Sequence, residues 1–179
     1  MNELRELYRH RQLIAALTAR DLKARYRGSV LGFFWSLANP LLLLAVYTLV
    51  FTKFFPQQVV PSYPLFLFSG ILPWTFFTAA VLEATAAISS NAGLIKKVMF
   101  PAEALPLVVV LSHLVHFLAA LPIMLAAMLA FTAMHKFTMS WTILLGPVLM
   151  LLQAIFVAGL ALIVSSASVL FRDLRDIVA

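Results

Sequence analysis

The residues that could do chemistry inside the long apolar stretches of this sequence are few. Glu83 is the one acidic side chain well inside such a stretch. A carboxylate within a membrane is a functional hypothesis by default, for binding a substrate or a proton. Because Glu83 lies about two helical turns from the end of its stretch, water or a partner side chain can also reach it. A structural hydrogen bond is therefore an equally good interpretation.

His113 and His116 are the next candidates, since they lie three residues apart and share one face of a helix. A metal site would need further ligands, and neither cysteine nor a nearby acid supplies them. We therefore predict no metal site, and we interpret these residues as buried, hydrogen-bonded histidines. Acids are scarce and mostly lie outside the apolar stretches, so there is no credible Ser/His/Asp set. The sequence does not predict an enzyme.

The glycines do not form a phosphate-binding loop. Gly28 and Gly32 are followed by apolar residues and not by Gly-Lys-Ser/Thr, so the chain has no visible means of binding ATP itself. The pair matches the small-xxx-small pattern of packed membrane helices. It could equally provide a flexible entry into the membrane.

The elements that carry these residues are membrane helices. Hydrophobic residues make up 63% of the 179 residues and charged residues 11%, with a mean hydropathy of +1.01. Such a composition belongs to a lipid-embedded protein. About 20 apolar residues span a bilayer, and four stretches reach that length: 31–54, 63–89, 104–130 and 141–170. We predict an all-α integral membrane protein with an N-terminal amphipathic interfacial helix followed by about four transmembrane helices.

The basic residues predict the orientation of the chain. Eleven of the 13 Lys and Arg residues fall on one side of the predicted spans, against Lys53 and Lys136 on the other. By the positive-inside rule both ends and the loop 90–103 are cytoplasmic. This rule also explains the net charge of +6, so we predict a lipid bilayer and no nucleic acid as a partner.

Segment 1–30 precedes the first span and is too polar to be a cleavable signal peptide. Wound as a helix, it gathers basic residues within an arc of about 60°. They are Arg5, Arg9, Arg20, Lys23 and Arg27. The opposing apolar side holds Leu4, Leu7, Tyr8, Ile14, Ala15 and Leu22. This pattern predicts a helix in the membrane surface, although a solvated basic helix that only sets topology is an alternative. Thr18 followed by Asp21 resembles a capping box, which would divide the segment into two helices.

The loop 90–103 mixes Lys96 and Lys97 with large apolar side chains and ends near Pro101. A loop that only reversed the chain would be polar. We interpret this one as a short amphipathic helix that docks into a groove of a partner protein. The alternative is an interfacial turn with its apolar face in lipid.

Three segments together resemble a known family. They are Arg20 to Trp35 with Asn39-Pro40, the loop Asn91 to Glu103, and Leu170-Phe-Arg-Asp-Leu-Arg-Asp-Ile177. In this order and spacing they resemble the permease subunit of a type-2 ABC exporter, in the group that exports polysaccharides or polyol phosphates. The resemblance implies a homodimer in the inner membrane of a bacterium, paired with separate ATPase subunits that bind ATP and Mg. It also implies a glycan on a polyprenyl diphosphate as substrate, such as O-antigen, capsule or teichoic acid.

The resemblance also implies roles for residues. Segment 1–30 would contain a gate helix that faces lipid headgroups, with Arg20, Asp21, Lys23, Arg25, Tyr26, Arg27, Gly28 and Trp35. Segment 90–103 would couple the chain to its ATPase through Asn91, Gly93, Leu94, Ile95, Lys96, Lys97, Val98, Phe100, Pro101 and Glu103. Possible channel residues are Tyr47, Phe51, Trp74, Phe77 and Glu83. Anchoring in lipid explains the aromatic ones equally well.

One departure from the family matters. Its members usually continue after the third segment with two more spans, whereas this sequence stops at Ala179. We therefore expect 171–179 to be the cytoplasmic end of an incomplete transmembrane domain. Two other functions stay open: a type-2 ABC exporter of a drug or lipid, and a non-transporting membrane scaffold or assembly protein.

Overall fold

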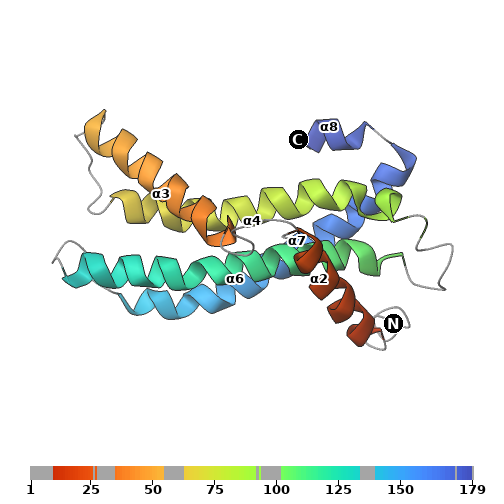
Figure 1. The fold of residues 1–179 in the computed structure, drawn as a ribbon, viewed down its shortest axis with the longest axis horizontal. Coiled ribbons are helices and arrows are strands. Elements are labelled where there is room, and N and C mark those ends of the chain that lie inside the picture. Colours follow the sequence, from red (N-terminus) through yellow and green to blue (C-terminus); the bar gives the residue numbers. More distant parts are fainter. Residues whose placement is uncertain are drawn as a thin grey trace. The chain divides into compact units, whose positions relative to one another are not determined.

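The computed structural model describes residues 10–25, 27, 35–54, 63–91, 93, 102–133, 140–171 and 173–178. Every regular element within these ranges is a helix (Figure 1). In chain order they are α2 (Arg11–Arg25), α3 (Trp35–Lys53), α4 (Tyr63–Ser90), α6 (Ala104–Ala133), the 3₁₀ helix η2 (Trp141–Leu145), α7 (Gly146–Leu170) and α8 (Leu174–Val178). The protein is therefore an all-α membrane protein, as its composition predicts.

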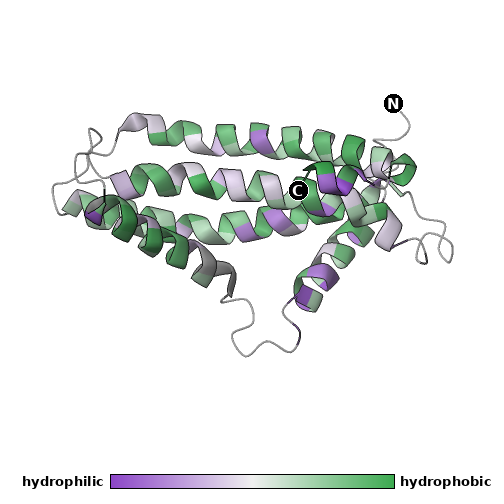
Figure 2. Cartoon of the chain, turned by 90° about the horizontal axis from the view of Figure 1, so that it is seen from above, coloured by the Kyte–Doolittle hydropathy of each residue, from purple (hydrophilic) through white to green (hydrophobic). Residues whose placement is uncertain are grey.

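Three helical stretches of the described chain are long and apolar enough to cross a membrane. They are Tyr63–Ser90, Ala104–Ala133 and Trp141–Leu170, of 28, 30 and 30 residues. Figure 2 shows hydrophobic residues along most of the length of the long helices. The apolar part of α3, Pro40–Phe51, is shorter than the roughly 20 residues that a span requires. Residues 31–34 of the predicted first span lie outside the described residues, so this fourth span stays a prediction.

Contacts between helices divide the chain into two compact units. The first unit contains Met1–Arg27, Phe77–Leu114 and Leu151–Ala179, and the second contains Gly28–Phe76 and Val115–Met150. Each of the three long helical stretches contributes residues to both units.

Small residues line the buried faces of α4 and α7 in the first unit. On each helix they are buried and recur at spacings of four and three residues: Ala80, Ala84 and Ala87 on α4, and Ala161, Ser165 and Ser168 on α7. Small side chains let helix backbones approach closely, which is what stabilises helix pairs in lipid. The two helices are also joined by a hydrogen bond. The Ser168 hydroxyl lies 2.5 Å from the Thr85 carbonyl oxygen and 2.8 Å from that of Ser165.

We expect Ser168→Ala to weaken this helix pair modestly. A hydrogen bond between membrane helices contributes about 0.6 kcal/mol on average, so the free energy of unfolding should fall by that order. The measurement is unfolding by SDS in mixed micelles. Ser166→Ala is a matched control, because its hydroxyl bonds only within α7, to the Leu162 carbonyl at 2.8 Å, and is exposed. Equal effects of the two substitutions would contradict the expectation.

Helix α2 packs on the first unit through one face. Its buried residues are Ile14, Leu17 and Thr18. The two apolar ones join a cluster with Ala87 of α4 and with Ala104, Leu105, Val108 and Val109 of α6. Each fully buried aliphatic side chain contributes roughly 1.5–3 kcal/mol, so the apolar attachment of α2 is small.

One detail of the prediction for α2 is wrong. Thr18 and Asp21 were expected to divide the segment into two helices, but the helix continues without a break from Arg11 to Arg25. The Thr18 hydroxyl donates back to the Ile14 carbonyl oxygen at 2.9 Å, so it satisfies itself within the helix and does not cap a new one.

The second unit has an aromatic core. Leu65, Phe68, Leu72 and Phe76 of α4 are all buried, at the three- and four-residue spacing of one helix face. Phe76 stacks on Phe117 of α6, with ring centroids 5.4 Å apart and an interplanar angle of 16°. This pairing fixes α4 against α6 within the unit.

Candidate functional site

A polar cluster joins three helices of the first unit at Glu83. One nitrogen of Arg25, Nη2, donates to both carboxylate oxygens of Glu83, at 2.7 and 2.9 Å. Nε2 of His113 lies 2.8 Å from Glu83 Oε2. A carboxylate can only accept, so this ring nitrogen carries the proton and donates. The cluster thereby connects α2, α4 and α6.

Asp21 extends the cluster along α2. Its Oδ2 lies 3.5 Å from Arg25 Nη2, a distance typical of an ion pair but too long for a strong hydrogen bond. Burial of the Arg25 guanidinium favours its neutral form. The hydrogen bond to Glu83 and the negative charges of Glu83 and Asp21 outweigh this effect and raise the pKa of Arg25 above its ordinary value.

The spacing of residues on α2 explains how Arg25 reaches Glu83. Ile14, Thr18, Asp21 and Arg25 recur every three or four residues, so they lie on one face. The first two are buried where α2 packs on the first unit. Docking of Ile14 therefore places Arg25, three turns later, against α4. The resemblance placed Arg25 among the residues that face lipid headgroups, but in the structure its side chain bonds to Glu83 of α4.

The cluster is partly open to its surroundings. The exposed fraction of the side chain is 29% for Arg25, 40% for Glu83 and 10% for His113. An isolated carboxylate within a membrane span is costly, and two donors from other helices compensate this one. The prediction of a buried, hydrogen-bonded histidine is confirmed for His113. The arrangement can hold helices together.

The remaining predicted headgroup residues separate into two groups. Arg20 and Lys23 are exposed on the side of α2 away from Ile14 and Thr18, and Arg27 is exposed in the turn after the helix. This leaves a basic surface that is free of the polar cluster. Tyr26 and Gly28 lie outside the described residues. Trp35 is the first residue of α3, and only its backbone is among the described parts of the structure.

The predicted channel residues fall in different units. Tyr47 and Phe51 belong to an aromatic row in the second unit that passes from α3 to Tyr63 and Phe66 of α4. Successive ring centroids are 6.2, 4.9 and 6.1 Å apart. Trp74 of α4, also in the second unit, is 63% exposed. Phe77 lies in the first unit with Glu83 and stacks on Phe156 of α7 at 6.2 Å. The structure thus assembles two of the five predicted residues directly.

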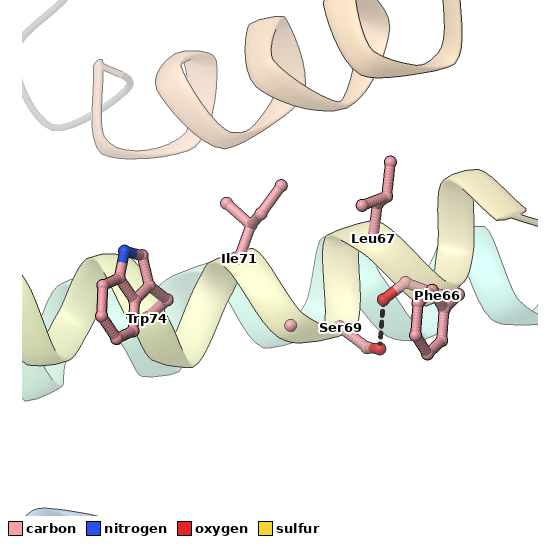
Figure 3. Close-up of a pocket in the computed structure, with 6 residues that line it drawn as sticks. Phe66, Leu67, Ser69, Ile71 and Trp74 are labelled. Atoms are coloured by element: carbon pink, nitrogen blue, oxygen red, sulfur yellow. Dashed lines mark hydrogen bonds between the residues drawn. The ribbon is translucent and has the colours of Figure 1, made fainter. Parts of the chain in front are cut away.

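The described residues of the second unit line at least two hollows. The larger, of about 500 Å³, lies between α3 and α4 and is lined by Pro40, Leu42, Leu43, Val46, Tyr47, Phe68, Ile71, Leu72 and Thr75. The other, of about 430 Å³, lies along α4 (Figure 3). There Leu67 and Ile71 point towards α3, and the Ser69 hydroxyl donates to the Phe66 carbonyl oxygen at 2.8 Å. The lining of both is almost entirely apolar.

The predicted coupling segment is described only at its ends. The side-chain amide of Asn91 donates to the Ala87 carbonyl oxygen at 2.9 Å and so closes the last turn of α4. Gly93 and Glu103 are exposed, the latter in the turn before α6. Ala87 and Ala104, near the two ends, share one buried cluster, which fixes both ends of the loop. The others lie outside the described residues: Leu94, Ile95, Lys96, Lys97, Val98, Phe100 and Pro101.

Sequence reasoning missed the association of Asp21, Arg25, Glu83 and His113. Two signals could have found it. Arg25 lies off the basic arc of its own helix, and Glu83 and His113 are polar residues in different predicted spans, each needing a partner. No group of three or more metal-binding side chains occurs within the described ranges.

The comparisons with known proteins agree with this architecture of long apolar helices preceded by a basic one. The chain belongs to the ABC-2 type transporter family, whose sequence profile matches residues 12–178. It is 43% identical over 176 residues to the O-antigen export system permease protein RfbA of Myxococcus xanthus, covering 98% of this chain and 66% of that protein.

Two further relatives are more distant. The O-antigen export system permease protein RfbA of Klebsiella pneumoniae is 35% identical over 167 residues, covering 93% of this chain and 63% of the relative. The polysialic acid transport protein KpsM of Escherichia coli is 28% identical over 85 residues, or 45% of this chain and 32% of the relative. The chain thus spans about two thirds of the length of the O-antigen relatives that it matches.

Proposed function

We propose that this chain is the transmembrane subunit of an ATP-driven exporter that moves a lipid-linked polysaccharide of the O-antigen type across the cytoplasmic membrane. The observation that carries the proposal is 43% identity, over nearly the whole chain, to a relative named as an O-antigen export permease. It acts as a homodimer with separate ATPase subunits that bind ATP and Mg. Both ends of the chain face the cytoplasm, as the distribution of Lys and Arg predicts.

The surfaces of the first unit support this division of roles. The exposed face of α2 carries Arg20 and Lys23, and Arg27 is exposed in the turn after the helix. Guanidinium groups are suited to bidentate binding of phosphate oxygens. This face would attract the diphosphate of a lipid-linked glycan. The loop that follows α4 combines Lys96 and Lys97 with Phe100, the composition of a segment that docks in a protein groove. It would receive the movement of the ATPase.

The first test is copurification with the ATPase encoded beside the chain. We expect the intact chain to retain the ATPase in detergent and Lys96→Glu/Lys97→Glu/Phe100→Asp to retain at least about tenfold less, because central interface residues carry most of the binding energy. Arg20→Glu/Lys23→Glu is the matched charge reversal. It should keep the ATPase but reduce the amount of glycan that reaches the cell surface.

The outcomes separate the alternatives. If the intact chain retains no ATPase, the exporter function is wrong and a scaffold role takes its place. If the ATPase is retained but ATP drives movement of a drug or lipid and not of glycan, the substrate class is wrong while the family mechanism stands.

A further inference from the structure

We propose that Asp21, Arg25, Glu83 and His113 form a reversible latch, a set of ion pairs and hydrogen bonds that holds α2 against α4 and α6 and can open. When the latch opens, each of its charged side chains keeps a partner. The part of this inference that concerns nucleotide-driven opening rests on the proposed function. The latch itself rests only on the contacts between these four side chains.

In the docked state, the pair Arg25–Glu83 closes the latch. Its two hydrogen bonds of 2.7 and 2.9 Å are short and charge-assisted, and they are the interactions that join the polar end of α2 to α4. They add to the small apolar contact of α2, which buries only Ile14 and Leu17 besides Thr18 among its described residues.

Each half of the latch also holds a second partner on its own side. Arg25 has Asp21 one turn earlier on α2, at 3.5 Å, the (i, i+4) spacing of helical ion pairs. Glu83 has His113 on α6, at 2.8 Å. If α2 moves away, Arg25 leaves with Asp21, and Glu83 stays with His113. Each charged side chain therefore loses one partner on separation and keeps the other, so no charge is left without a partner.

The partial exposure of the side chains also supports reversible opening of the latch. Breaking a fully buried ion pair leaves an uncompensated charge and is therefore strongly unfavourable. Here Arg25, Glu83 and Asp21 are each about one third exposed, so the separating groups are already within reach of water or headgroups. His113, which would remain behind with Glu83, is the most buried member. An element with two compensated arrangements is what a reversible switch requires.

The absence of cysteine from the sequence allows a direct test. Thr18→Cys places a single thiol in the buried face of α2, where maleimide labelling in membranes reports opening. In this background Arg25→Gln and Glu83→Gln remove the closing pair, and we expect labelling about tenfold faster, equivalent to about 1.4 kcal/mol.

A second pair of variants should slow the maleimide labelling at position 18 instead of speeding it. Asp21→Asn and His113→Phe remove the partners that compensate the open state, while Arg25–Glu83 stays intact. We expect labelling to be about twofold slower than in the Thr18→Cys parent, since these partners matter most when the latch is open. A static brace predicts the reverse, because removing any member would then loosen α2.

Two control thiols keep the result interpretable. Ala16→Cys is exposed and should label fast in every variant, whereas Ser165→Cys is fully buried in α7 and should label only after denaturation. If all four variants speed labelling of the thiol at position 18 while the thiol at position 165 stays protected, the latch is a static brace and the proposal is wrong. It is also wrong if Arg25→Gln and Glu83→Gln leave labelling unchanged.

The final arm uses the complex with the ATPase and a non-hydrolysable ATP analogue. Faster labelling of Thr18→Cys on nucleotide binding supports opening within the transport cycle. No change in an assembled complex overturns nucleotide-driven opening, even if the opposite signs of the variants still establish the latch. If no ATPase assembles, the proposed function fails, and the labelling of the chain alone still decides on the latch.

Discussion

Replacing Ser165 with leucine is expected to lower the free energy of unfolding by roughly 1–3 kcal/mol, the range for overpacking a well-packed site. Ser165 is fully buried on α7, in a row with the buried small residues Ala161 and Ser168, and Ser168 bonds to α4. A leucine side chain needs space that the close approach of the two helices does not leave. Unfolding by SDS in mixed micelles, followed by circular dichroism, measures the change.

The neighbouring position provides the control. Ser166 is exposed, and its hydroxyl, like that of Ser165, bonds only to the Leu162 carbonyl oxygen. Ser166→Leu therefore removes the same type of bond and adds the same volume on the outer side of the helix, where lipid accommodates it. We expect it to be neutral. Similar destabilisation by both substitutions would mean that α7 does not pack through this row.

Glu83→Ala is expected to have the next largest effect, a loss of about 1–2 kcal/mol in the free energy of unfolding. Breaking a fully buried pair by removing one partner costs roughly 3–5 kcal/mol. We expect less here because Glu83 and Arg25 are both about one third exposed to water, and because Arg25 keeps Asp21 as a partner at 3.5 Å. The measurement is the same SDS titration.

Glu103→Ala is the matched control for Glu83→Ala, since Glu103 is an exposed acid in the turn before α6. Surface substitutions of this kind usually stay within about 0.5 kcal/mol. If the two substitutions destabilise equally, the polar cluster does not hold α2, α4 and α6 together. A further comparison with Arg25→Ala should give a similar loss. The double variant should lose less than the sum of the two single losses, because the residues share one interaction while each also has a second partner.

The long helices could be predicted from the sequence because their signal is local. Runs of apolar residues such as 104–130 are long enough to specify a membrane helix without knowledge of any partner. The position of α2 could not be predicted in this way. Its apolar moment is weak, and the residues that decide its docking, Ile14 and Leu17, look like any other short apolar pair.

The polar cluster was outside the reach of sequence reasoning for a related reason. Glu83 and His113 could each be assigned a hydrogen bond, but the partner of Glu83 was not identifiable. Arg25 lies 58 residues earlier, in a helix whose other basic residues point elsewhere. Likewise, the aromatic row from Tyr47 to Phe66 depends on how α3 turns towards α4, which composition does not specify.

The distance along the chain between Arg25 and Glu83 has a consequence for biosynthesis. Their bond cannot form until 58 further residues have been made, which takes about 3–12 s at 5–20 residues per second. During that interval α2 carries its basic residues without the protein surface that later covers one of its faces. In the orientation that we propose, those charges would then be available to hold the amino-terminal end of the chain on the cytoplasmic side while the first spans insert. Helix α2 would thus first orient the nascent chain and only afterwards pack into the folded structure.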